Sequence, residues 1–362
     1  MNLINEVNEA RLQIHTDSYP MSIGELVSLY DEKELNINPK FQRVYRWNTT
    51  QKSRLIESIF LGIPLPSIFV SQRSDGVWDV VDGLQRLSTI LSFMGKLKDE
   101  NYPENNFLAT EKTKYLPSLA NKTWDELAPE LKRIFKREKI DIKIIKRESD
   151  ENAKLELFQR LNTGGSELTA QEIRNCLLIM INYNAFEYVK NLSSNSDFLE
   201  TMPISEKKSE EASYEEYVIR YFIQQFYDKN LRNKHTNIGP YFDEATITLF
   251  HSNSKFEYEK EQKIFEKTFS TINKALGEDA FKKFNNDEKK YKGPVLNSIF
   301  EILTLIIANK IKEEKILTQD YIQNISRKAS EKIQCIPPNS RPIDKMDLTY
   351  KIAQELLDNE KN

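Results

Sequence analysis

The sequence contains few of the residues from which metal centres are built. Its 362 residues include only two cysteines, Cys176 and Cys335, and three histidines, His15, His235 and His251. The cysteines lie far apart and form no CxxC pair, and the histidines are scattered along the chain. Because no zinc-ligand spacing is present, the sequence predicts no metal-ligating residues.

Long apolar runs are missing as well. No stretch approaches the length of a membrane span, and the first residues, MNLINEVNEARLQ, contain no apolar core of the kind found in signal peptides. The expectation is therefore a cytoplasmic protein without a membrane partner.

An excess of positive charge is the third feature that the chain lacks. Its 52 basic and 55 acidic side chains give a formal net charge of −3, which is not the overall charge of a dedicated nucleic-acid-binding protein. A local basic patch remains compatible with this total, because the total averages over all faces. The length is sufficient for roughly two domains of ~150 residues each.

The pattern of the sequence changes near residue 150. Before it, strand-like runs at 67–72 and 77–81 flank an Asp-Gly turn, and isoleucines alternate with charged residues over 140–144. After it, apolar residues recur at helical spacing. The sequence predicts a small α+β domain over residues 1–150 and an α-helical domain over residues 151–362.

The stretch VVDGLQRLSTI, residues 80–90, passes from an apolar run into a predicted helix and places Arg86 in its first turn. A cation at this end of a helix is unfavourable, because the macrodipole is already positive there. A nearby anion would remove the conflict. That anion is either a carboxylate of the chain or a phosphate, which helix N-termini bind through their free N–H groups.

Helix capping explains two other residues of this stretch without any function. Asp82 at the N-cap and Gln85 three residues later would form a capping box. Capping does not explain Arg86, for which an internal salt bridge is the alternative to phosphate binding.

Two further stretches contain residues suited to nucleotide binding. In FQRVYRW, Phe41, Arg43, Tyr45 and Trp47 share one face if the segment is extended, and such a face can stack a base and contact a phosphate. A half-buried edge strand would have the same pattern. In LFQRLNTGG, residues 157–165, a helix ends in a glycine-bearing turn whose amides can face an anion, although an ordinary helix stop fits equally well.

Together these stretches resemble the N-terminal domain of GmrSD-type modification-dependent restriction enzymes, which has a ParB/sulfiredoxin-like fold. The QR-x-Y-x-W segment of that family is matched by Gln42, Arg43, Tyr45 and Trp47. Its DGQQR signature is matched by Asp82, Gly83, Gln85 and Arg86, with Leu84 in place of the first glutamine. Its later F-x-x-L-N, L-x-x-x-E-I-R and E-x-x-x-R segments are matched by Phe158, Leu161, Asn162, Leu168, Glu172, Ile173, Arg174, Glu216 and Arg220.

The resemblance implies a domain that binds and hydrolyses a nucleoside triphosphate, with Mg²⁺, in a prokaryotic system that restricts foreign or modified DNA or defends against phage. In that interpretation Arg86 holds phosphate charge. Asp82 caps the loop and orients a water or a Mg²⁺-bound water, and Gln85 forms hydrogen bonds to phosphate or water. These three residues are the candidate catalytic group.

The resemblance also implies a nucleotide-binding set around that group. Arg43 supplies a second cationic contact, and Tyr45 or Trp47 stacks on the base or forms the pocket wall. Gln42 and Gly83 belong to the matched motifs, and Asn162 closes the site from the helical side.

The chain departs from the two-part members of that family in its second half. Their C-terminal HNH nuclease needs histidines, whereas after residue 225 only His235 and His251 occur, in KHTN and LFHSN contexts. We therefore expect a stand-alone component that acts with a separate nuclease or modification enzyme, with DNA as a further candidate partner. Two alternatives remain: a non-catalytic nucleic-acid-binding regulator switched by nucleotide, and a weak ParB-like nuclease.

Overall fold

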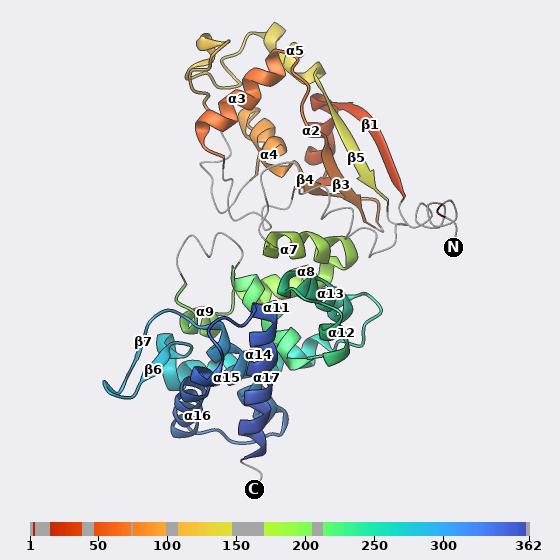
Figure 1. Ribbon diagram of the computed structural model, residues 1–362. Helices are drawn as coiled ribbons and strands as arrows, with labels where there is room; N and C mark the ends of the chain where they lie inside the picture. Colours follow the sequence, from red (N-terminus) through yellow and green to blue (C-terminus); the bar gives the residue numbers. More distant parts are fainter. Residues whose placement is uncertain are drawn as a thin grey trace. The chain divides into compact units, whose positions relative to one another are not determined.

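The chain divides into two compact units, residues 1–168 and 169–362 (Figure 1). The computed structural model describes Leu3 and residues 15–37, 47–73, 75–98, 108–146, 170–204 and 213–359. The domain boundary predicted at residue 150 lies outside the described residues.

Unit 1 contains a five-stranded mixed sheet with the strand order β1-β5-β3-β4-β2. The strands are β1 (Thr16–Ser22), β2 (Leu35–Asn36), β3 (Ile68–Gln72), β4 (Trp78–Asp82) and β5 (Lys139–Ile145). β3 and β4 form the antiparallel hairpin predicted around the Asp-Gly turn, and β5 runs parallel to β3. In β5, Ile140, Ile142 and Ile144 are buried while Lys139 and Asp141 are exposed, as alternation predicts for a strand with one face in the core.

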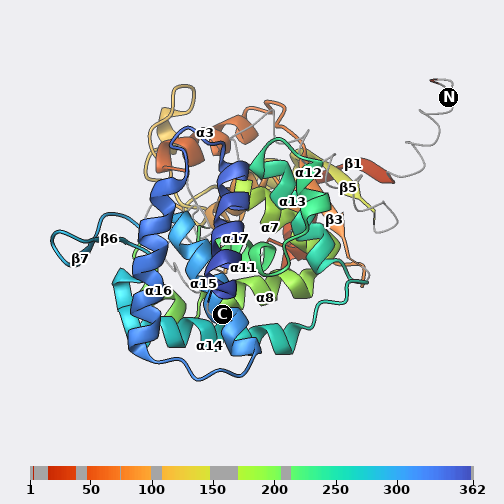
Figure 2. The same cartoon turned by 60° about the horizontal axis from the view of Figure 1, so that its bottom comes forward.

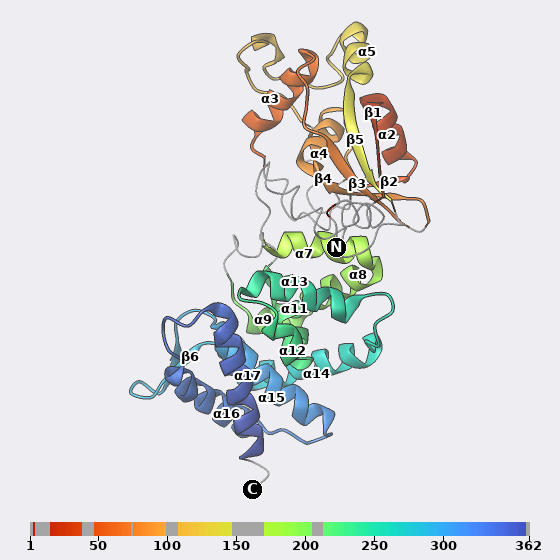
Figure 3. The same ribbon diagram turned by 45° about the vertical axis from the view of Figure 1, so that its right-hand side comes forward.

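Four α-helices of unit 1 are described: α2 (Ile23–Asp31), α3 (Thr49–Phe60), α4 (Leu84–Phe93) and α5 (Pro129–Arg137). α3 begins at a capping box in which Asn48 and Gln51 each accept a hydrogen bond from the other's backbone N–H. α3 and α4 pack against each other (Figure 3). Their apolar faces join the sheet in one hydrophobic core.

Unit 2 is almost entirely helical where it is described. Its α-helices are α7 (Ala170–Ile181), α8 (Tyr183–Ser193), α9 (Ser196–Thr201), α11 (Ser213–Gln225), α12 (Lys229–Asn233), α13 (Ile238–Phe250), α14 (Tyr258–Leu276), α15 (Asn297–Lys312), α16 (Gln319–Lys332) and α17 (Pro342–Asp358). α15 is buried along residues 299–308 and packs against α11, α14, α16 and α17 (Figure 2).

The described strands of unit 2 are only β6 (Lys283–Asn285) and β7 (Lys290–Lys292), which form a short hairpin. The predicted α+β fold, with its sheet near the N-terminus and helices after it, is therefore confirmed. Within the described ranges, no helix combines the length and apolar content that a membrane crossing requires.

Candidate functional site

The turn from β4 into α4 is built on Gly83. Its φ of 90° and ψ of 11° lie in the left-handed region, which favours glycine. A Cβ at this position would lie 2.8 Å from Cγ1 of Ile68 and 2.9 Å from Nη2 of Arg86. Both the backbone conformation and the close approach therefore require glycine, and the turn holds Arg86 against the end of the sheet.

Asp82 is not the N-cap of α4, so the predicted capping box is wrong. β4 continues through Asp82, the chain turns at Gly83, and the helix begins at Leu84 with no side-chain capping hydrogen bond. The left-handed glycine takes the N-cap position, and the Asp82 carboxylate instead accepts a hydrogen bond from Arg86.

Arg86 lies in the first turn of α4, and its neighbours accept hydrogen bonds from only some of its guanidinium N–H groups. Its Nη2 donates to the Ser67 carbonyl oxygen at 3.1 Å and to Asp82 Oδ2 at 3.2 Å. Its Nε is buried and makes no hydrogen bond in the described part of the chain. The Arg86 side chain is 15% exposed and that of Asp82 is 46% exposed. The internal salt bridge thus exists, but it involves a half-solvated carboxylate and leaves a buried N–H of the guanidinium without an acceptor.

Gln85 connects this helix to α3. Its Oε1 accepts a hydrogen bond from the backbone N–H of Trp47 at 3.3 Å, and Trp47 packs half-buried against the core of unit 1. Trp47 immediately precedes Asn48, the N-cap of α3. The N-termini of α3 and α4 therefore meet at this hydrogen bond, and the positive ends of both macrodipoles lie close together.

Lys52 adds a cation to the same end of α3, and the sequence reasoning missed it. Helical spacing places Lys52 on one face with Ile56 and Ile59, which are buried. Lys52 itself is half-buried, and this burial lowers its pKa to about 8. The sequence feature that could have indicated this residue is a lysine at the end of a row of apolar residues at helical spacing.

The structure brings together the described part of the predicted site. Asp82, Gly83, Gln85 and Arg86 form one turn, and the backbone of Trp47 is bonded to it. The remaining predicted residues, Gln42, Arg43, Tyr45 and Asn162, lie outside the described residues.

Glu216 and Arg220 are four residues apart, a spacing that predicts an ion pair on one helix. The pair forms in unit 2, with Nη2 of Arg220 3.0 Å from Oε1 of Glu216. Arg220 is not a surface residue, however, and its Nη1 donates to Oε1 of the buried Glu301 at 2.6 Å. Thr349 in turn donates to Oε2 of Glu301 at 2.6 Å. Burial by itself lowers the pKa of Arg220, but Glu301 and Glu216 outweigh that effect and raise it. The charged network fastens α11, α15 and α17 together.

Arg174 lies in the same interior. Its guanidinium is 5.3 Å from the ring centre of Phe242, and that of Arg220 is 4.8 Å from the same ring. Nε of Arg174 is 3.7 Å from Oδ1 of Asp243, and burial lowers the pKa of Arg174. Both motif arginines are thus buried in unit 2, and Nε and Nη1 of Arg174 make no hydrogen bond with the residues that the structure describes.

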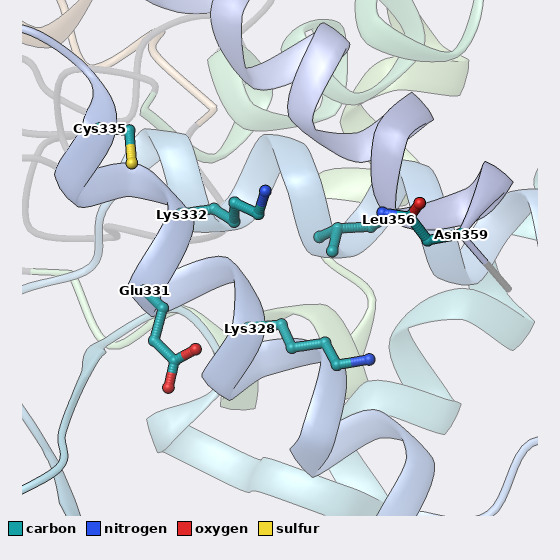
Figure 4. A pocket seen from close by; sticks show the side chains of 6 residues that line it. All are labelled: Lys328, Glu331, Lys332, Cys335, Leu356 and Asn359. Carbon is teal, nitrogen blue, oxygen red and sulfur yellow. The ribbon is translucent and has the colours of Figure 1, made fainter.

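A pocket of about 470 Å³ lies between α16 and α17 (Figure 4). Its lining residues are Lys328, Glu331, Lys332, Cys335, Leu356 and Asn359. Lys332 is engaged by Glu355 at 2.5 Å, and Cys335 is an exposed free thiol. The pocket contains no nucleophile hydrogen-bonded to a base, so it does not compete with the turn at Arg86 as a candidate site.

The comparison with known families identifies the segment that carries this turn. Residues 23–179 match the family described as GmrSD restriction endonuclease, N-terminal domain. The matched segment includes Trp47 and the whole β4–α4 turn, so the resemblance predicted from the motifs is confirmed for this part of the chain. No curated protein matches the chain.

Proposed function

We propose, on the premise that residues 23–179 form a GmrSD-type N-terminal domain, that this domain binds and hydrolyses a nucleoside triphosphate at the N-terminus of α4. The family indicates a component of a restriction system. In our proposal the chain supplies the nucleotide-dependent step, and a separate nuclease or modification enzyme acts on the DNA.

The observation that carries the proposal is the state of Arg86. Its buried Nε has no acceptor in the described part of the chain, and it lies at a helix N-terminus that no side chain caps. A phosphate oxygen would accept from Nε and from the amides of the first turn. The same anion would offset the repulsion between the arginine and the helix dipole. A charge-assisted contact of this kind contributes about 1.5–3 kcal/mol.

Asp82 is suited to a role that depends on phosphate. Its carboxylate is half-exposed and shares Nη2 of Arg86 with the Ser67 carbonyl. A phosphate that draws the guanidinium toward itself would release Asp82 to accept a hydrogen bond from the attacking water, which it would thereby orient.

Mg²⁺ fits this arrangement as a nucleotide-bound ion. Among the residues that the structure describes, no three Asp, Glu, His or Cys side chains gather into a metal-binding group. Mg²⁺ in nucleotide sites is held mainly by phosphates and keeps several waters, and Asp82 would orient one of these waters. When bound, the ion would neutralise phosphate charge.

Gln85 and Trp47 then have a positioning role. Because Oε1 of Gln85 holds the Trp47 backbone, it fixes the end of the aromatic segment relative to Arg86. Lys52, near the N-terminus of α3, would add a further positive charge that attracts the phosphates.

The test is a calorimetric titration of the whole chain with ATP and GTP in Mg²⁺, together with an assay of phosphate release. Arg86→Ala should weaken nucleotide binding by roughly ten- to a hundred-fold, the equivalent of one charge-assisted contact. The control is Lys96→Ala, which removes an exposed cation just past the opposite end of α4 and should leave affinity unchanged.

Equal affinity of Arg86→Ala and wild type would refute the proposed site. Tight binding by the wild type without phosphate release would instead support the nucleotide-switched regulator and refute hydrolysis.

A further inference from the structure

α5 is a helix that unit 1 hardly buries. Phe135 is the one buried residue among its nine, whereas α4 buries eight of its ten. Four of the other residues of α5 are cations: Lys132, Arg133, Lys136 and Arg137. We call these four the basic face. With Glu130 as the only acid, the helix carries a net charge of +3 (four minus one) in a chain whose total is −3.

No carboxylate of the described residues neutralises the cations of the basic face. Elsewhere in unit 1, Lys96 and Lys146 are paired with Asp31 and Asp17. Within the described ranges, no member of the basic face forms such a pair. As far as the described residues go, the charge of α5 is therefore open to an external anion.

The two lysines are fixed by an aromatic ring instead. Nζ of Lys132 lies 5.8 Å from the ring centre of Trp124, and Nζ of Lys136 lies 6.0 Å from it. Lys132 also donates to the Asp125 carbonyl oxygen at 3.2 Å. These contacts hold the lysine stems against the domain and leave their charge intact.

Arg133 and Arg137 have no such anchor among the described residues and are exposed one helical turn apart. Their Cβ atoms are about 5–6 Å apart at this spacing. Duplex DNA presents one phosphate per ~3.4 Å of axis on each strand, so both guanidinium groups can contact one phosphate backbone. Guanidinium also binds phosphate through paired N–H donors.

We propose that the basic face of α5 is a sequence-independent contact surface for the phosphate backbone of duplex DNA. The inference rests on the restriction setting of the proposed function, but it does not depend on nucleotide binding. Leu131 and Ile134 are each 40% exposed on the same helix, and a protein partner docked on them is the competing outcome. The helix has four cations but only two partly exposed apolar side chains, which favours the polyanion.

The experiment measures binding of the whole chain to a fluorescent mixed-sequence duplex between 50 and 200 mM NaCl. Arg133→Ala combined with Arg137→Ala should reduce the slope of log K against log[NaCl] by about 1.8, or ~0.9 for each lost phosphate contact. The loss should be the same for unrelated duplex sequences, because phosphate contacts carry no base information.

The matched control is Lys263→Ala combined with Lys267→Ala. These exposed lysines are also one turn apart, on α14, and their removal changes the net charge by the same amount. The control should keep the wild-type slope. Equal slopes for the two double variants would overturn the proposal, as would a wild-type chain that does not bind duplex. Either result would favour a protein partner on Leu131 and Ile134.

Two cross-measurements separate this proposal from the nucleotide site. The α5 double variant should bind nucleotide as tightly as wild type, and Arg86→Ala should keep the wild-type salt slope. Loss of nucleotide binding by Arg86→Ala combined with an unchanged slope in the α5 variant would refute the DNA surface alone.

Discussion

Arg220 has two carboxylate partners of very different burial, and the structure predicts very different consequences of losing each. The side chain of Glu301 is 3% exposed and that of Glu216 is 35% exposed, while Arg220 itself is 7% exposed. Glu301→Gln leaves a buried guanidinium without its main counter-charge and should cost about 3–5 kcal/mol of unfolding free energy. Glu216→Gln removes a partly solvated partner and should cost about 0.2–1 kcal/mol.

The distribution of tryptophan makes this difference measurable for unit 2 alone. All three tryptophans, Trp47, Trp78 and Trp124, belong to unit 1, so their fluorescence reports on unit 1. Circular dichroism at 222 nm reports mostly on the helices of unit 2. At about 2–4 °C per kcal/mol for a unit of this size, Glu301→Gln should lower the melting temperature seen by circular dichroism by roughly 6–20 °C. The fluorescence transition should stay in place.

Similar shifts for the two variants would contradict the reasoning, because they would mean that burial does not determine the strength of the pair. A shift confined to the fluorescence signal would contradict the assignment of the network to unit 2.

Three further predictions concern Gly83, Lys52 and the two histidines of unit 2. Gly83→Ala should lower the melting temperature seen by tryptophan fluorescence, because the added Cβ would approach Ile68 to 2.8 Å at a φ of 90°. An unchanged transition would mean that the turn can change its conformation without loss of stability. Burial lowers the pKa of Lys52 to about 8, so between about pH 8 and 10.5 the unfolded chain binds more protons at this site. The contribution of Lys52 should therefore make stability rise with pH in that window, and urea titrations should show a smaller rise for Lys52→Gln. The purified chain should not cut modified or unmodified plasmid with Mg²⁺ or Mn²⁺ and each NTP. The reason is that His235 contacts Glu244 and His251 accepts a hydrogen bond from the Asn253 backbone N–H. Double-strand cleavage that copurifies with the chain would refute this prediction.

The parts of the fold that the sequence predicted are those governed by local rules. Alternation identified β5, and the Asp-Gly turn identified the β3–β4 hairpin. Each depends on residues within a few positions of one another, so the sequence contains the whole signal.

The parts that it missed depend on three-dimensional contacts. Asp82 and Gln85 have the spacing of a capping box, but the left-handed Gly83 moved the N-cap by one residue and gave both side chains other partners. The main partner of Arg220 is 81 residues away in the chain, so helical spacing revealed only its weaker partner. The burial of Lys52 likewise depends on tertiary packing around α3.

The central claim, that Arg86 binds nucleotide phosphate, is tested most directly by the stabilisation of unit 1 by nucleotide. At a nucleotide concentration of 100 times the wild-type Kd, the unfolding free energy followed by tryptophan fluorescence should rise by about 2.7 kcal/mol in the wild type. In Arg86→Ala, with affinity lowered ten- to a hundred-fold, it should rise by only about 0.4–1.4 kcal/mol. Without nucleotide the two proteins should differ by about 1 kcal/mol, because the lost hydrogen bonds are partly offset by relief of the helix dipole. Equal nucleotide stabilisation of both proteins, or a loss of 3–5 kcal/mol without nucleotide, would show that Arg86 is part of the architecture and would contradict the account.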